Sequence, residues 1–151
     1  MANQYNHDWI DGRQVPPLVI HENYVLNYAH AGSVHVESGR FKLAGVLQGS
    51  LDIQSGVSAI ITGTQQGSVS IASGSVVTVY GAIEGSTNVE SGGTLIIEEG
   101  GKLSGSLANH GKVILRGLFG GNNIGAGELK IEDKGRIIQP IVKDGINYYE
   151  F

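Results

Sequence analysis

The glycines of this chain recur at a nearly fixed interval, and this feature constrains the fold more than any other. Gly-Ser or Gly-Asn steps, spaced 17, 18, 18, 20 and 16 residues apart, begin at Gly32, Gly49, Gly67, Gly85, Gly105 and Gly121. Ser-Gly pairs follow the first four steps at 38–39, 55–56, 73–74 and 91–92, and a third glycine recurs at 45, 63, 81 and 117. Self-similarity at a fixed period is typical of repeat proteins. Each repeat therefore has three turn points.

The segments between these turns alternate apolar and polar residues, which predicts strands because successive side chains of a strand point to opposite faces. On a first face we expect the inward pairs Val34/Val36, Leu51/Ile53, Val69/Ile71, Thr87/Val89 and Leu129/Ile131. On a second face we expect Phe41/Leu43, Ala59/Ile61, Val77/Val79, Leu95/Ile97 and Val113/Leu115. A third, shorter face supplies the single anchors Leu47, Ile83, Leu103 and Phe119.

Strands this short are not stable alone, but a recurring unit can coil so that each strand pairs with its counterpart one turn later. The sequence therefore predicts an all-β, single-domain parallel β-helix (β-solenoid) of about six to seven coils, with three short strands per coil and capped ends. Glycine suits its tight corners because it adopts positive φ without strain. Tyr24 and Leu26 match Phe41 and Leu43, so an incomplete coil precedes Gly32. The irregular spacings predict one corner lengthened at 98–101 and the next shortened at 108–111.

Aromatic residues gather outside the regular coils, which predicts terminal caps. Seven of the ten lie there: Tyr5, Trp9, Tyr24, Tyr28, Tyr148, Tyr149 and Phe151. We therefore divide the chain into an N-terminal capping segment (1–17), the β-helix (18–140) and a C-terminal capping segment (141–151). Pro16, Pro17 and Pro140 stand where the coils begin and stop, as expected for residues that cannot donate ladder hydrogen bonds. Ordinary packing in short terminal strands is the alternative explanation of these aromatics.

Composition excludes several other classes. The chain has 24 glycines in 151 residues but only 3 prolines, which excludes collagen, and each glycine inside a helix costs about 1 kcal/mol relative to alanine. A 40% hydrophobic content and a net charge of −4 argue against disorder. Scattered Lys and Arg in an acidic chain predict no nucleic-acid partner. No apolar run suggests a membrane span, and the polar N-terminus carries no secretory signal, so we expect a cytoplasmic protein.

Two stretches resemble the coils of a known family. Gly-Val-Leu-Gln-Gly-Ser-Leu-Asp-Ile-Gln-Ser-Gly (45–56) and Gly-Ala-Ile-Glu-Gly-Ser-Thr-Asn-Val-Glu-Ser-Gly (81–92) are similar to the coils of bactofilins, which are bacterial cytoskeletal proteins. The resemblance covers about residues 32–138. It implies a parallel β-helix core in a bacterial protein and assembly end to end into filaments without nucleotide. The aromatic termini depart from the family pattern.

One outward row of the predicted second face is unusually apolar. Asp52 and Glu84 are the only charged residues between Gly49 and Val89, and the outward positions read Lys42, Ile60, Thr78, Ile96 and Ile114. Contiguous exposed apolar patches are rare on monomers. We therefore predict a protein-binding site at Ile60, Thr78, Ile96 and Ile114. Two alternatives stay open, namely that a terminal segment folds over this row or that two copies pair through it.

The sequence offers no convincing catalytic, metal or cofactor site. Cysteine is absent, and the five histidines, His7, His21, His30, His35 and His110, have no regular metal-ligand spacing. No Gly-x-Ser-x-Gly elbow is present. We therefore expect no catalytic residues, no cofactor and no enzyme activity. Two function classes remain: a capped β-helix that binds another protein, for example an immunity-type inhibitor of a toxin, or a bactofilin-like scaffold that polymerises end to end.

Overall fold

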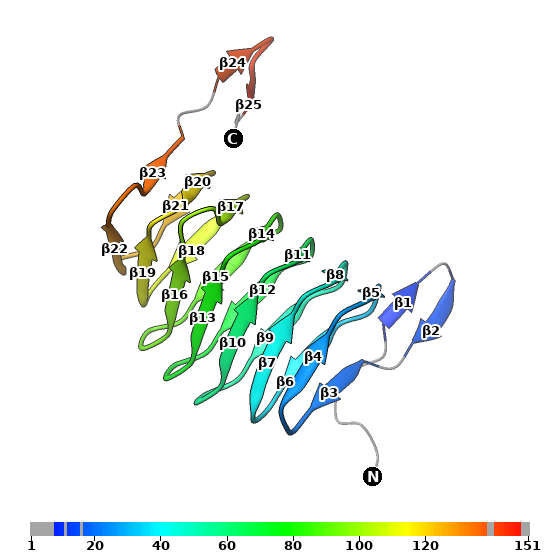
Figure 1. The fold of residues 1–151 in the computed structure, drawn as a ribbon. Helices are drawn as coiled ribbons and strands as arrows, with labels where there is room; N and C mark the ends of the chain where they lie inside the picture. Colours follow the sequence, from blue (N-terminus) through cyan, green and yellow to red (C-terminus); the bar gives the residue numbers. More distant parts are fainter. Residues whose placement is uncertain (1–7, 11, 16, 139–140, 149–151) are drawn as a thin grey trace.

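The computed structural model describes residues 8–10, 12–15, 17–138 and 141–148, and in these residues the chain forms a stack of short strands with no helix. Its body is a parallel β-solenoid of about seven turns (Figure 1). Each turn contributes one strand to each of three seven-stranded sheets. The predicted all-β parallel β-helix with three strands per coil is confirmed.

The three sheets follow one another around every coil. The first sheet contains β3 (Leu18–Ile20), β6 (Val34–Val36), β9 (Leu51–Ile53), β12 (Val69–Ile71), β15 (Thr87–Val89), β18 (Leu107–Asn109) and β21 (Asn123–Ile124). The second contains β4 (Tyr24–Leu26), β7 (Arg40–Leu43), β10 (Ser58–Ile61), β13 (Val76–Val79), β16 (Thr94–Ile97), β19 (Lys112–Leu115) and β22 (Glu128–Ile131). The third contains β5 (Ala29–His30), β8 (Val46–Leu47), β11 (Thr64–Gln65), β14 (Ala82–Ile83), β17 (Lys102–Ser104), β20 (Leu118–Gly120) and β23 (Arg136–Ile137).

Equivalent inward side chains stack on one another along the axis and form a single apolar core. In the second sheet Ala59 pairs with Phe41 and Val77, and all three are buried. The third-sheet anchors Leu47, Ile83, Leu103 and Phe119 are buried as expected. Each buried aliphatic side chain contributes roughly 1.5–3 kcal/mol relative to its exposed state, so this stack is the main source of stability.

One expected inward pair belongs to another sheet. Leu129 and Ile131 pair with Val113 and Leu115 in the second sheet, not with strands of the first sheet. The first sheet continues instead through β18, whose inward residues are Leu107 and Asn109. Asn109 interrupts the apolar pattern, yet its amide is satisfied inside the coil, because Nδ2 donates to Glu128 O at 2.9 Å and Oδ1 accepts from Gly111 N at 3.1 Å.

The corner glycines are required for two different reasons. Gly56 has φ of +80°, and a Cβ there would meet nothing within 4 Å, so its role is the positive φ that we expected of the corners. Gly63 is not in the positive-φ region, but a Cβ there would overlap the carbonyl oxygen of Gly45 on the preceding coil. Positive φ therefore explains the Ser-Gly corners, whereas close approach of neighbouring coils explains the corner between the second and third sheets.

The irregular spacings have the predicted origin. Four residues, Glu98 to Gly101, separate β16 from β17, whereas two residues, Tyr80 and Gly81, separate β13 from β14 one coil earlier. The next corner is shortened, since only His110 and Gly111 separate β18 from β19. The two changes compensate, so the register of the second sheet continues from β16 to β19.

A short antiparallel hairpin lies near each end of the chain. β1 (Asp8–Ile10) pairs with β2 (Arg13–Val15), and β24 (Ile141–Lys143) pairs with β25 (Ile146–Tyr148) (Figure 1). Among the aromatics assigned to the ends, Tyr24 belongs to the first coil and stacks on Phe41 with ring centroids 6.5 Å apart. Tyr5, Tyr149 and Phe151 lie outside the described residues, as do Pro16 and Pro140. The division into 1–17, 18–140 and 141–151, with caps at both ends, stays a prediction.

Candidate binding surface

The four residues predicted to bind a partner lie in one row on the outer face of the second sheet. The register places Ile60 between Lys42 and Thr78, and Ile114 pairs with Ile96. The full row reads Val25, Lys42, Ile60, Thr78, Ile96, Ile114 and Lys130. Their shared outward row follows from the period of two residues per strand. Their role in binding stays a prediction.

A second outward row runs beside the first, two residues earlier on each strand. It reads Arg40, Ser58, Val76, Thr94, Lys112 and Glu128. The centre of the face, between the cations at its two ends, carries only uncharged side chains. Ile60 is 41% exposed and Val76 is 36% exposed, while Ile96 and Ile114 are half-buried. In the described part of the chain no terminal segment buries Ile60.

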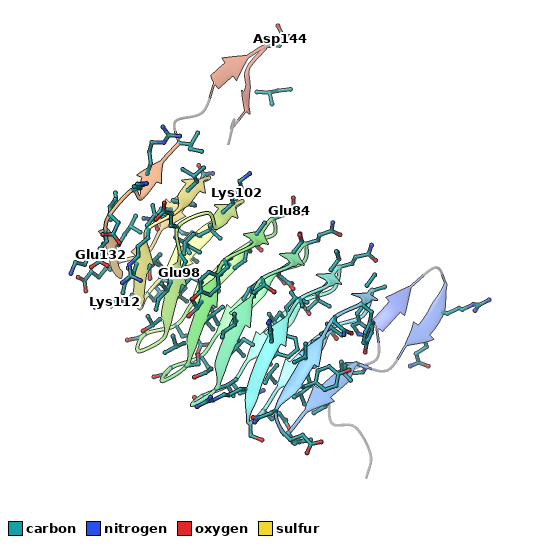
Figure 2. All side chains as sticks on the ribbon, in the orientation of Figure 1. Glu84, Glu98, Lys102, Lys112, Glu132 and Asp144 are labelled. Carbon is teal, nitrogen blue, oxygen red and sulfur yellow. The ribbon has the colours of Figure 1, made fainter. Side chains whose placement is uncertain are left out.

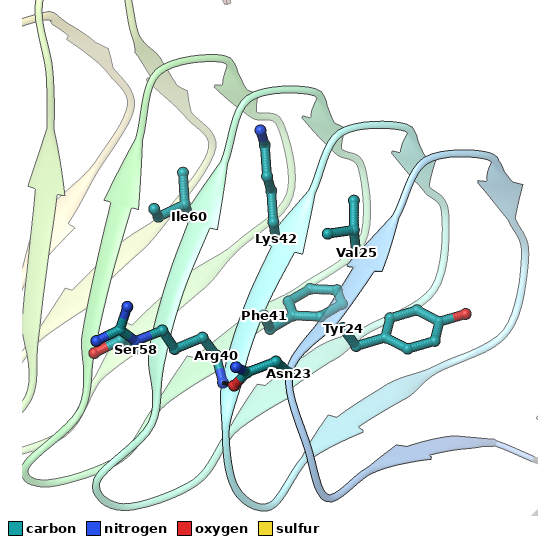
Figure 3. Close-up of a pocket in the computed structure, with 8 residues that line it drawn as sticks. All are labelled: Asn23, Tyr24, Val25, Arg40, Phe41, Lys42, Ser58 and Ile60. Carbon is teal, nitrogen blue, oxygen red and sulfur yellow. Dashed lines mark hydrogen bonds between the residues drawn. The ribbon is translucent and has the colours of Figure 1, made fainter.

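A pocket of about 260 Å³ hollows the N-terminal end of this face. Figure 3 shows Val25, Lys42 and Ile60 side by side on successive strands, with the rings of Tyr24 and Phe41 and a second line of Asn23, Arg40 and Ser58. Asn23 Oδ1 accepts a hydrogen bond from Arg40 N at 3.0 Å, which ties β7 to the turn before β4. The exposed side chains of the pocket thus include the apolar Val25 and Ile60 and the cationic Arg40 and Lys42, whereas the Phe41 ring points into the core.

Charged side chains concentrate on the last coils, at the corner after the second sheet (Figure 2). Arg116 contacts Glu98 on the preceding coil and pairs with Glu132 on the following coil at 3.0 Å. These hydrogen bonds, led by that to Glu98, raise the pKa of Arg116. The ammonium of Lys130 and the guanidinium of Arg116 lower the pKa of Glu132. This network links three successive coils by ion pairs, and its charged groups are paired with one another without a ligand.

A shallow polar groove runs along the outer face of the first sheet. Its lining repeats one serine per coil, at Ser50, Ser68, Ser86 and Ser106. At one end His35 Nδ1 lies 3.1 Å from Asp52 Oδ2, and Asp52 also accepts from Gln54 Nε2 at 3.2 Å. We did not predict this pair from the sequence, although a search for opposite charges one period apart would have found it.

Inside the third sheet, polar atoms replace an apolar anchor at one position. Gln65 is buried, and its Nε2 donates to the carbonyl oxygens of Gly49, Gly67 and Ser68 at 2.9, 3.1 and 3.3 Å. Gln65 Oε1 and His30 Nε2 are buried without a hydrogen-bond partner among the described residues. The Gln65 side chain is enclosed by the coils, whereas His30, on the first strand of the third sheet, is partly exposed.

No three His, Asp or Glu side chains of the described segments cluster as they would around a metal ion. Within the same segments no helix is long and apolar enough to cross a membrane.

We compared the chain with family models, curated proteins and solved structures, and none of them matches it. Of what the resemblance to bactofilins implied, the structure shows the parallel β-solenoid fold.

Proposed function

We propose that this chain is a non-catalytic β-solenoid that binds another protein through the outer face of the second sheet. The observation that carries the proposal is the uncharged centre of that face, where Ile60 and Val76 are exposed next to Ile96 and Ile114. Exposed apolar rows of this length mark interaction sites more often than ordinary surface. Parallel pairing along seven coils keeps the row straight and preformed.

The size of the face limits the mode of binding. Seven strands about 4.8 Å apart and about 13 Å long present roughly 400 Å². A standard interface buries about 800 Å² on each partner. A partner that forms an interface of this size therefore also contacts the corners that flank the sheet, so we expect the natural partner to be a globular protein domain.

The specific form of the proposal is an immunity-type inhibitor of a toxin. A small solenoid with one continuous, preformed face is suited to blocking a partner by covering it. This form is tested by co-expressing the chain with the protein encoded next to its own gene, once that protein has been shown to act as a toxin that arrests growth when expressed alone. Survival of the cells and a complex that co-elutes in size-exclusion chromatography support it, whereas growth arrest with no complex contradicts it.

The role of the face is tested by substitution. Replacing Ile60, Ile96 and Ile114 by Lys should abolish binding to that toxin while the circular-dichroism spectrum keeps its β signature. The matched control replaces Ser70, Asn88 and Ala108 by Lys, which are outward positions on β12, β15 and β18 of the first sheet. If the control weakens binding as much as the triple isoleucine variant, the second sheet is not the binding face.

A bactofilin-like scaffold that polymerises end to end is the second candidate, and one observation favours it. Ile131, at an inward position of β22, is 50% exposed, whereas its register partner Leu115 on β19 is buried. The last coil thus offers apolar surface and free strand edges to another molecule. Negative-stain microscopy of the purified protein tests this candidate: filaments that Ile131→Asp abolishes support it, and a monodisperse protein contradicts it.

A further inference from the structure

The outer face of the second sheet carries a charge opposite to that of the whole chain. Its outward positions hold four cations, Arg40, Lys42, Lys112 and Lys130, against one carboxylate, Glu128. The chain as a whole has 14 acidic and 10 basic residues. The face therefore has a positive rim around an uncharged centre on an otherwise acidic molecule.

The cations at the N-terminal end of the face are not neutralised within the described residues. Lys130 pairs with Glu132 at 3.1 Å, whereas Arg40 and Lys42 occur in no ion pair of the described part of the chain. Both side chains edge the pocket near Val25 and Ile60 (Figure 3). A carboxylate reaching this end of the sheet would meet two cations that have no competing partner there.

The volume of the pocket indicates what it can hold. Sites for drug-sized ligands and cofactors span roughly 300–1,000 Å³. At about 260 Å³ and open to solvent, this pocket is below that range. It accommodates one or two amino-acid side chains, and the exposed apolar side chains of Val25 and Ile60 that line it favour an aliphatic or aromatic one. Buried anchors of this kind dominate the energy of protein interfaces.

The same charges disfavour parallel pairing of two copies through this face, because Arg40 and Lys42 of both copies would then meet. Like charges placed opposite one another oppose association. In an antiparallel pair Arg40 and Lys42 of one copy would meet the end of the other, where Glu128 and Glu132 stand beside Lys112 and Lys130. The carboxylates there are balanced by lysines, so this end offers the two cations less net negative charge than an acidic segment of another protein.

We infer that the end of the second sheet around Arg40 and Lys42 receives an acidic segment of the partner protein, with an apolar side chain in the pocket and flanking carboxylates on the two cations. The inference rests on the proposed function, because it names the chemistry of the partner at the same face. Attraction between the partner's carboxylates and the two cations steers the encounter. The apolar side chain in the pocket then slows dissociation of the complex.

The test uses three synthetic peptides and the full chain. The first has Phe and Leu flanked on both sides by Asp residues, the second replaces Phe and Leu by Ser, and the third replaces Asp by Lys. Isotope-labelled protein is titrated with each peptide and followed by amide chemical shifts. We expect the first peptide alone to shift the amides of residues 23–25, 40–42 and 58–60, with an affinity that falls as salt is added.

Two variants locate the effect. Arg40→Glu with Lys42→Glu should weaken the first peptide at least tenfold, whereas Lys102→Glu with Arg136→Glu, the same charge change on the third sheet, should leave its affinity unchanged. The inference is overturned if the second or third peptide binds equally well, if the control pair weakens binding as much, or if the first peptide does not bind.

The outcome separates this inference from the proposed function. One outcome is that the Lys substitutions at Ile60, Ile96 and Ile114 abolish toxin binding whereas Arg40→Glu with Lys42→Glu does not. That result would support binding through this face and contradict the inference that the partner presents an acidic segment to Arg40 and Lys42. The oligomeric state of the unmodified protein is measured by sedimentation equilibrium. A dimer that Ile60→Lys dissociates would show that a second copy occupies the face, and this result would overturn the inference.

Discussion

Gln65 occupies the inward position of the third sheet that Ile83 holds one coil later, and the two residues pair directly in the parallel ladder. A buried amide thus stands in a column of aliphatic side chains. Its Nε2 donates hydrogen bonds to the carbonyl oxygens of Gly49, Gly67 and Ser68. The buried amide therefore satisfies backbone acceptors of the corner after the third sheet.

Gln65→Glu should destabilise the protein by about 3 kcal/mol or more at neutral pH, because a buried carboxylate without a counter-ion replaces a donor that faces carbonyl oxygens. Burial raises the pKa of such a carboxyl above its unfolded value of about 4.3. The penalty should therefore be largest above the folded pKa and shrink as the pH falls below it. Urea unfolding at several pH values measures this, and Gln65→Leu, which carries no charge, should show no such recovery in acid.

Gly63→Ala should cost several kcal/mol and Gly56→Ala only about 1 kcal/mol. A methyl group at Gly63 overlaps the backbone of the preceding coil, whereas at Gly56 it meets open space and adds only the strain of a positive φ. Thermal unfolding of the two variants gives the comparison. Equal losses would show that positive φ, and not the spacing between coils, governs both corners.

Ile60→Lys and Ile61→Lys test the two faces of one strand. Ile60 is exposed, so its replacement should change the free energy of unfolding by less than about 1 kcal/mol. Ile61 is buried in the core, and an unpaired lysine there should cost more than about 4 kcal/mol or prevent folding. Expression yield and denaturant midpoints distinguish them, and the prediction is wrong if Ile60→Lys is the more harmful.

The corner network around Arg116 should make stability depend on pH in acid. The pKa of Glu132 is lowered in the folded state, so its contribution is present above the unfolded pKa, near 4.5, and is lost as the pH falls through the folded pKa. The melting temperature should therefore fall more steeply below about pH 4.5 in the wild type than in Glu132→Gln. Parallel pH profiles of the two proteins would contradict this role of Glu132.

The repeat made most of this fold predictable, because strand alternation and glycine spacing depend only on local chemistry. The outward row of Ile60, Thr78, Ile96 and Ile114 followed from the same period. The inward pair of the sixth coil in the first sheet was assigned wrongly because Asn109 replaces an apolar residue there. Its amide is hydrogen-bonded to Gly111 in its own corner and to Glu128 on the next coil, and the sequence alone does not distinguish such a residue from a surface one. The pocket at Arg40 was not predictable, since its shape depends on how the exposed side chains of Val25, Lys42 and Ile60 are arranged on successive coils.

The half-exposed Ile131 also bears on how the molecule comes apart. In a solenoid each coil is held only by its neighbours, so opening can spread stepwise from an end. Both residues of β21 are exposed and the core side chains of β22 are only partly covered, whereas Leu26 in the first coil is buried. The stack therefore unzips from its C-terminal coil. Amide protons should exchange in a gradient that is fastest near Ile131 and slowest in the central coils.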